Sequence, residues 1–269
     1  MPPIKAWTAN DLPDLSRKRI VVTGGNSGIG FEAAREFAHT GAYVVLACRS
    51  MEKATAAAAQ ITASHPHAAV EVMELDLSSL DSVRSFARAF RTKYRKLHVL
   101  CNNAGVMALP HRRTAEGFEM QFGTNHLGHF ALTGLLLEPL LGTEGARVVT
   151  VSSSAHRMGR IQFDDLQWER GYSEWLAYGQ SKLANLLFAF ELQRRADATG
   201  VSLKSLACHL GYAATNLQAT GPQSATASDP KSGQLFVPPS AAVKDGAEKL
   251  VKEDSSLTAG SHVLREVPT

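Results

Sequence analysis

Two side chains that could move a proton lie four residues apart in the chain. Tyr178 and Lys182 belong to a segment with helical spacing of its apolar residues, and a separation of four residues places both on one helix face. A phenol is a poor acid at its ordinary pKa of about 10, and a neighbouring ammonium lowers that pKa by stabilising the phenolate. We therefore expect an acid–base pair of the kind that a carbonyl needs when it accepts a hydride and its oxygen becomes negative.

A glycine-rich turn gives the chain a second candidate site. Residues 23–30 follow a short apolar run and precede a segment with helical spacing. Residues without a Cβ allow a tight turn, and the first turn of a helix offers unpaired N–H groups and the positive end of its dipole to a phosphate. The sequence therefore predicts a dinucleotide site in this strand–turn–helix context. The contacts in the turn would come from Gly24, Asn26, Ser27, Gly28, Ile29 and Gly30.

The order of these motifs resembles that of the short-chain dehydrogenase/reductase family. The glycine turn, the run Asn-Asn-Ala-Gly at residues 102–105, and the pair Tyr178 and Lys182 follow one another as in that family, over residues 16–218. The resemblance implies a nicotinamide-dependent oxidoreductase in which Tyr178 is the general acid, while Lys182 lowers its pKa and binds the ribose. It also implies that Ser153 orients the carbonyl, and that Asn125 completes the proton path by holding a water next to the lysine.

Ser153 is selected from a run of three serines, residues 152–154. The run follows the fifth predicted strand, at the carboxyl edge where open parallel sheets bind ligands, and a hydroxyl there can hydrogen-bond a substrate oxygen. The family pattern Val-Ser-Ser-x-Ala aligns with Ser153, which leaves the other two as polar residues at a strand end. Asn125 also has a plainer interpretation, as an ordinary helix asparagine.

The end of the second predicted strand carries a cation that bears on the choice of dinucleotide. A ribose 2′-hydroxyl is commonly bound by an acidic residue at this position, whereas a 2′-phosphate favours a cation. Arg49 and Ser50 stand there without a carboxylate, so we expect NADP(H), unless Arg49 is only a solvated surface cation. The resemblance adds the cofactor contacts Asp76, Leu77, Asn103, Ala104, Gly105 and Thr215. Asp76 can instead cap a helix or a turn.

The elements that must position these residues alternate between strands and helices, which predicts an α/β fold. We expect one doubly wound Rossmann-type domain over residues 1–269, with a mainly parallel sheet and helices on both faces. Residues 219–269 would form a shortened substrate lid and a C-terminal segment. The predicted strands are residues 19–23, 43–47, 70–75, 99–102, 147–151 and 202–208, and the predicted helices are residues 29–39, 53–63, 79–90, 117–140, 175–198 and 241–252.

Composition excludes several classes of protein. The 269 residues are 44% hydrophobic and 20% charged with a formal net charge of +3, which is typical of a globular protein rather than of a disordered or nucleic-acid-binding chain. No stretch is apolar and long enough to span a membrane or to serve as a signal peptide, so we expect a cytoplasmic protein. Three cysteines without metal-like spacing are expected to be reduced thiols, and no metal is expected.

A narrower resemblance concerns the long stretch between Ser153 and Tyr178, together with residues 125–130. Both are similar to the retinol dehydrogenase, WW-domain oxidoreductase and protochlorophyllide reductase-like branch of the family, which implies a small lipophilic alcohol or carbonyl substrate. Leu210 replaces the usual proline before Gly211, and the segment after it is short. Two alternatives therefore stay open: an NADP(H)-binding scaffold with little turnover, and a carbon–carbon double-bond reductase. The apolar face of residues 175–198 fits either a core or a homodimer interface.

Overall fold

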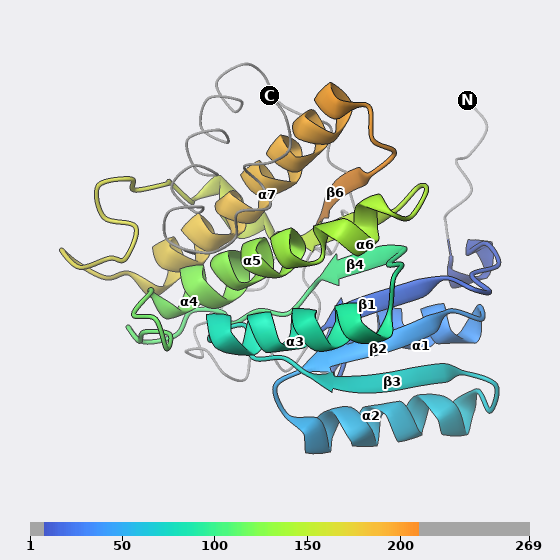
Figure 1. Ribbon diagram of the computed structural model, residues 1–269. Helices are drawn as coiled ribbons and strands as arrows, with labels where there is room; N and C mark the ends of the chain where they lie inside the picture. The colour runs from blue at the N-terminus through green and yellow to red at the C-terminus, as the bar shows by residue number, and fades with distance from the viewer. Residues whose placement is uncertain (1–7, 210–269) are drawn as a thin grey trace, which may run out of the picture.

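Six parallel strands form one sheet in the order β3-β2-β1-β4-β5-β6 (Figure 1). The structure is a computed structural model and describes residues 8–209. Three neighbouring strands, Arg19–Thr23, Tyr43–Cys48 and Val99–Asn102, are short and mostly apolar or β-branched and are almost entirely buried, as parallel strands covered on both faces should be. The other three strands are partly exposed. The strands are β1 (Arg19–Thr23), β2 (Tyr43–Cys48), β3 (Ala69–Glu74), β4 (Val99–Asn102), β5 (Arg147–Val151) and β6 (Lys204–Cys208).

Helices cover both faces of the sheet. One apolar core lies between the sheet and α3, α5 and α7, and a second lies between β1, β2 and the helices α1 and α2. Figure 1 shows α3, α5 and α7 on the side of the sheet opposite α1 and α2. The predicted doubly wound fold class is confirmed. The helices are η1 (Ala9–Asp11), α1 (Gly28–His39), α2 (Met51–Ser64), α3 (Leu80–Lys93), α4 (Met120–Phe122), η2 (Gly123–Leu127), α5 (Gly128–Leu135), α6 (Leu137–Leu141), η3 (Ser154–Arg157) and α7 (Glu174–Thr199).

The strand order reverses between β1 and β4. From β1 the chain moves outward through β2 and β3, and it then returns to the other side of β1 to build β4, β5 and β6. The crevice above the carboxyl ends of the two strands at such a reversal is the usual ligand site of open α/β sheets. The glycine turn follows β1 and the Asn-Asn-Ala-Gly run closes β4, so the topology brings these two motifs together.

The predicted single helix over residues 117–140 is wrong. Gly117 has a φ of +85° and lies in a turn, and the helix begins only at Met120. Glu119 caps it, since its carboxylate accepts hydrogen bonds from the backbone N–H groups of Gln121 (2.9 Å) and Phe122 (2.6 Å). A π-helical turn, η2, follows, and the helix breaks again between α5 and α6, three residues before Pro139, whose ring nitrogen cannot donate to the preceding turn.

The other predicted elements within the described range agree with the structure to within three residues at each end, and the largest difference is the end of α3, at Lys93 rather than residue 90. The predicted helix 241–252 and the predicted lid lie outside the described residues. All three cysteines are free, as expected. No helix between residues 8 and 209 combines the length and the apolar character needed to cross a bilayer.

Candidate active site

The glycine turn and the loop after β4 are joined through one threonine side chain. Thr23 Oγ1 accepts hydrogen bonds from the backbone N–H groups of Asn103 and Ala104, both at 2.9 Å. The Asn103 side chain makes a second hydrogen bond to the same threonine, since its Nδ2 donates to the Thr23 carbonyl at 2.8 Å. A Cβ on Gly30 would lie 2.4 Å from that same Nδ2, so only glycine lets the amide sit against the start of α1. The two predicted cofactor motifs are therefore one structural unit.

The start of α1 has the chemistry of an anion site. Ser27 is the N-cap residue, yet its side chain makes no capping hydrogen bond, so it leaves the first-turn N–H groups to another acceptor. Gly24 and Gly28 have φ values of +66° and +54°, which explains why the turn is built from glycine. Asn26 and Ile29 are half-buried beside Ser27. These residues fit the phosphates of a dinucleotide.

Arg49 is exposed at the end of β2, directly before the N-terminus of α2. Ser50 caps that helix, since its hydroxyl accepts from the Lys53 N–H at 3.4 Å. The guanidinium thus stands beside a helix N-terminus, and both features attract an anionic group. This placement fits a 2′-phosphate at the predicted position.

Asp76 has the turn role that its sequence position also allowed. Its Oδ1 accepts hydrogen bonds from the Ser78 N–H (2.9 Å) and the Ser78 hydroxyl (2.6 Å). Leu77 is buried, and its carbonyl oxygen would lie 2.4 Å from a Cβ on Gly128, so this residue packs against the start of α5. Contact of either residue with an adenine stays a prediction. Thr215, the last predicted cofactor contact, lies outside the described residues, as do Leu210 and Gly211.

Tyr178 lies in the second turn of α7 and is only 4% exposed. Burial raises the pKa of its phenol, and a hydrogen bond with the Ser153 side chain acts in the opposite direction. The neighbouring serines are placed differently, because the Ser152 hydroxyl donates to the Lys182 carbonyl at 2.8 Å and Ser154 is exposed. The structure thus brings Ser153, and not its two neighbours, to the Tyr178 hydroxyl.

Lys182 lies one turn further along α7 and is also 4% exposed. Its Nζ donates to the Val151 carbonyl at 3.2 Å and lies 5.6 Å from the centroid of the Tyr178 ring. Burial lowers the pKa of this ammonium to about 8. The expectation that Lys182 would bring the Tyr178 pKa below its usual value is not met by this arrangement, because desolvation of the phenol is the largest effect on that pKa.

Asn125 lies in the π-helical turn η2 and is completely buried. Its Nδ2 donates to the Val106 carbonyl and to the Ser181 hydroxyl, both at 2.9 Å, and its Oδ1 accepts from the Val106 N–H at 2.7 Å. A Cβ on Gly105 would lie 3.0 Å from Asn125 Oδ1 and 3.5 Å from Lys182 Nζ. The loop after β4, the π-helical turn and the lysine therefore meet at one point. Turns of this type occur often at functional sites.

Asn185 is a site residue that the sequence analysis missed. Its Nδ2 donates to the Val151 carbonyl at 3.2 Å, the same oxygen that accepts from Lys182. Behind it, a ring nitrogen of His126 lies 3.1 Å from Asn185 Oδ1. The position of Asn185, seven residues after Tyr178 and three after Lys182, was the available signal, since these spacings place all three on one helix face.

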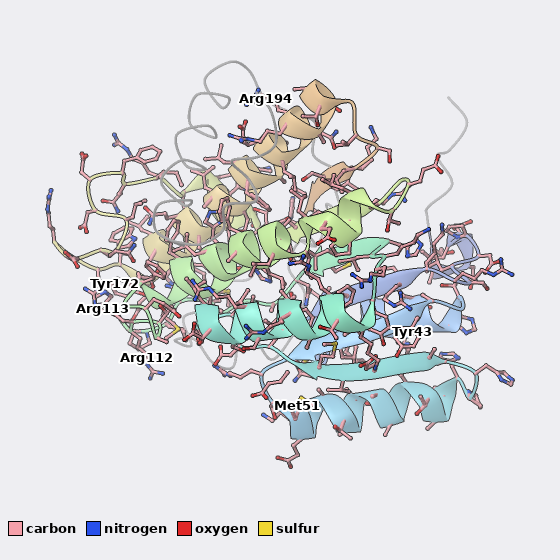
Figure 2. All side chains as sticks on the ribbon, viewed as in Figure 1. Tyr43, Met51, Arg112, Arg113, Tyr172 and Arg194 are labelled. Atoms are coloured by element: carbon pink, nitrogen blue, oxygen red, sulfur yellow. The ribbon has the colours of Figure 1, made fainter. Side chains whose placement is uncertain are left out.

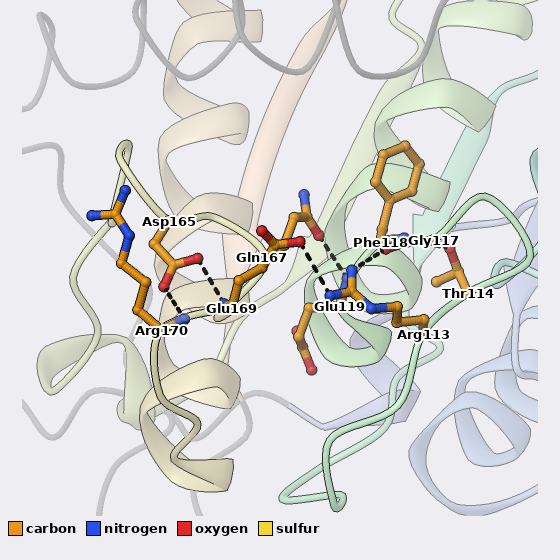
Figure 3. Close-up of polar contacts among 9 residues, drawn as sticks. All are labelled: Arg113, Thr114, Gly117, Phe118, Glu119, Asp165, Gln167, Glu169 and Arg170. Carbon is orange, nitrogen blue, oxygen red and sulfur yellow. Dashed lines mark hydrogen bonds and ion pairs between the residues drawn. The ribbon is translucent and has the colours of Figure 1, made fainter.

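The long stretch between Ser153 and Tyr178 is held by polar contacts over residues 165–170. Figure 3 shows Gln167 accepting from the Glu119 N–H (2.6 Å), and the Asp165 carboxylate accepting from the Glu169 and Arg170 N–H groups. In Figure 2, Tyr172 lies beside Arg113 near the start of α4, at the opposite end of the molecule from Tyr43. This stretch therefore packs on the carboxyl-edge side of the sheet, next to the candidate site.

Two histidines lie beside the candidate site. His156 Nδ1 donates to the Ser153 carbonyl at 2.6 Å, so its ring packs against the loop that follows β5. Together with His209 it contributes to a small hollow, and the other lining residues are Ser152, Leu186, Ala207 and Cys208. Among residues 8–209 there is no group of three or more potential metal ligands.

Known proteins were compared with the chain. The model of the short chain dehydrogenase family matches residues 18–225. Retinol dehydrogenase 12 of Mus musculus is 52% identical over 185 residues, which cover 69% of this chain and 58% of that protein. Retinol dehydrogenase 11 of Homo sapiens is 52% identical over 192 residues, covering 71% and 60% respectively. The chain therefore spans about three fifths of the length of these curated relatives.

Solved structures agree with this result. An uncharacterized protein from Mycobacterium Paratuberculosis is 46% identical, has a TM-score of 0.79, and is aligned over 94% of this chain and 97% of its own. A short chain dehydrogenase from Shigella flexneri 2a str. 301, solved in complex with NADP, is 27% identical with a TM-score of 0.62, over 79% and 85%. The matched family model and the retinol dehydrogenase relatives confirm the expected branch, and the chain belongs to the short chain dehydrogenase family.

Proposed function

We propose that this chain is an NADP(H)-dependent oxidoreductase that transfers a hydride between the nicotinamide and an alcohol or carbonyl compound. One observation carries the proposal. A buried tyrosine that is hydrogen-bonded to Ser153 lies one helical turn from a buried lysine, at the carboxyl edge of the sheet. The same edge carries the anion site at the start of α1. Membership in an oxidoreductase family supports this reading.

The dinucleotide, when bound, donates or accepts the hydride. During reduction of a carbonyl, the Tyr178 hydroxyl supplies the proton that the oxygen gains, and the Ser153 hydroxyl donates a hydrogen bond to the same oxygen as its charge grows. The phenolate that remains is attracted by the Lys182 ammonium, 5.6 Å from the ring centroid, although the cost of burying the phenolate is the larger effect. Since this ammonium has a pKa of about 8, it can itself pass a proton back to Tyr178 near neutral pH.

The choice of NADP(H) rests on Arg49, and a substitution tests it. We expect Arg49→Ala to weaken NADPH binding about 10- to 100-fold, because a charge-assisted contact with the 2′-phosphate is lost, and to leave NADH binding unchanged. Titration calorimetry with both dinucleotides measures this. Arg88→Ala, which removes an exposed arginine from α3, is the matched control. NADH binding as tightly as NADPH in the unsubstituted protein would refute the assignment. The neighbour solved with NADP supports this choice.

The substrate class is proposed from the relatives and from the chemistry of the site. Several relatives are named retinol dehydrogenase, so a small lipophilic alcohol or carbonyl is the proposed substrate. The test is NADPH oxidation with a panel of aldehydes, ketones and enones, followed by analysis of the products. Conversion of an aldehyde or ketone to its alcohol supports the proposal. Saturation of the enone carbon–carbon bond alone indicates the double-bond reductase, and NADPH binding without any turnover indicates a cofactor-binding scaffold.

The run of three serines provides a sharper test of the catalytic assignment. Ser153→Ala removes the hydroxyl that bonds Tyr178, and we expect kcat to fall about 100-fold, as when one donor to a developing oxyanion is lost. Ser154→Ala removes an exposed hydroxyl one residue away, and kcat should change less than about twofold. Steady-state kinetics with the best substrate of the panel distinguish the two variants. Equal losses in both would mean that the serine has been assigned wrongly.

A further inference from the structure

His129 is a buried residue that contacts two parts of the site, Thr23 at the end of β1 and Asn125 in the π-helical turn. It lies in α5, is 1% exposed, and faces the carboxyl end of β1. Its Nδ1 lies 2.9 Å from the backbone carbonyl of Asn125, and its Nε2 lies 2.9 Å from Thr23 Oγ1. Through these two contacts one imidazole reaches both the π-helical turn and the threonine that holds the loop after β4.

The contacts determine where the proton sits on the ring. A carbonyl oxygen only accepts, so Nδ1 must carry the hydrogen that goes to Asn125. The ring is neutral, because burial lowers the pKa of His129 to about 3, and the charges of Lys182 and His126 that face it act in the same direction. The hydrogen bond with Asn125 opposes this shift but is the smaller effect. In a neutral imidazole with Nδ1 protonated, Nε2 is an acceptor.

The contacts of the Thr23 hydroxyl likewise determine the direction in which it donates its hydrogen bond. Its oxygen already accepts from the N–H groups of Asn103 and Ala104, which occupies both lone pairs. Its single proton must therefore be donated, and His129 Nε2 at 2.9 Å is closer than the other available acceptor, the Cys101 carbonyl at 3.2 Å. Every hydrogen-bonding group of Thr23 and His129 has a partner in this arrangement.

We propose that His129 is a positioning residue that holds the dinucleotide-binding loop through Thr23 and the π-helical turn of Asn125 through its carbonyl. The chain of contacts has a direction. Nε2 of the imidazole accepts a hydrogen bond from the Thr23 hydroxyl, which leaves the lone pairs of the Thr23 oxygen to the N–H groups of residues 103 and 104. Nδ1 of the same ring donates to the Asn125 carbonyl. The predicted effects on cofactor and turnover rest on the proposed function, whereas the ring tautomer does not.

The first experiment is nitrogen NMR of the protein labelled with ¹⁵N-histidine. The His129 signals are assigned by their loss in His129→Gln. We expect a protonated Nδ1, an unprotonated Nε2, and no titration between pH 5 and pH 8. The opposite tautomer, or a titration midpoint near the ordinary value of about 6.5, overturns the proposal. This readout needs neither substrate nor cofactor, so it stands even if the proposed activity fails.

Two substitutions separate the two contacts. The side-chain amide of His129→Asn can replace Nδ1 but does not reach Thr23, so the NADPH dissociation constant should rise about fivefold with little change in kcat. The side-chain oxygen of His129→Gln can replace Nε2 but leaves the Asn125 carbonyl without its donor, so kcat should fall about fivefold with little change in NADPH binding. Dissociation constants come from fluorescence titration with NADPH, and kcat from the best substrate of the carbonyl panel.

The control is Phe130→Leu, which shrinks the neighbouring buried ring on α5. It should lower stability and leave both the NADPH dissociation constant and kcat within about twofold. Similar behaviour of His129→Asn and His129→Gln in both quantities, or effects no larger than those of the control, would show that His129 is only a packing residue. If the unsubstituted protein binds NADPH but turns over no substrate, the proposed function fails. The NADPH titrations and the histidine NMR spectra still decide the role of His129.

Discussion

Replacing Tyr178 by phenylalanine should reduce turnover at least about 1,000-fold, while NADPH binding changes less than about threefold. The substitution removes the phenol that bonds the Ser153 side chain, and a positioned acid contributes about 100- to 10,000-fold to rate. The ring and its edge-to-face contact with Trp175, at 6.2 Å between centroids, remain, so the local packing is preserved. Stopped-flow and steady-state kinetics, with NADPH titration on the same sample, measure both quantities.

A control for the loss of a phenol is Tyr43→Phe. Tyr43 lies at the end of the molecule opposite to the site (Figure 2), where its hydroxyl donates to Glu71 at 2.6 Å. Its loss should lower stability by about 1 kcal/mol and leave kcat unchanged. Substantial activity in Tyr178→Phe, with NADPH binding intact, would disprove the proposed acid.

The protein without cofactor should become more stable when Lys182 is replaced by methionine, although turnover is lost. Among the described residues the buried ammonium donates to one acceptor, the Val151 carbonyl, and burial lowers its pKa from 10.5 to about 8. A depression of this size corresponds to about 3 kcal/mol of unfavourable free energy at pH 7, and methionine fills a similar volume without a charge. Urea unfolding at pH 7 should therefore give a free energy of unfolding about 2 kcal/mol higher for Lys182→Met.

The stability difference between Lys182→Met and the unsubstituted protein should depend on pH. Between about pH 8 and pH 10.5 the unfolded chain still binds the Lys182 proton while the folded chain has released it, so the stability of the unsubstituted protein rises with pH through this window. The advantage of Lys182→Met is then complete below pH 8 and disappears toward pH 10.5. Lys204→Met, which removes an exposed lysine from β6, is the matched control. A constant difference across the range would mean that the ammonium is not destabilising.

The architecture and the main site residues could be predicted because they leave local patterns. Strands such as β1 and β2 are continuous apolar runs bounded by turn residues, and the glycine turn has a spacing that few other structures require. Tyr178 and Lys182 share a helix face, so their proximity follows from their separation alone. Ser153 could be chosen from three candidates only through a family pattern, and its contact with Tyr178 agrees with that choice.

The features that could not be predicted depend on contacts between distant segments. The π-helical turn at Asn125 is held by Val106 and Ser181, which are 19 and 56 residues away in the chain. The raised pKa of the Tyr178 phenol comes from burial, which a sequence motif does not report. The Asp76 position matched a cofactor contact and a turn residue equally well, and only the coordinates supply its bonds to Ser78.

The stretch between Ser153 and Tyr178 has a consequence for how this protein can diverge. The Gln180 side chain accepts a hydrogen bond from the Gln162 N–H (3.0 Å) and donates one to the Leu166 carbonyl (3.1 Å). The Gln167 side chain accepts a hydrogen bond from the Glu119 N–H. The bonds at Gln162 and Leu166 use main-chain atoms of the stretch, so they do not depend on the side chains at those positions, although Leu166 is also buried in an apolar cluster. Changes of preference for one compound over another can therefore accumulate among the exposed side chains of this stretch, such as Asp164, while Gln180, two residues from Tyr178, keeps the stretch in place.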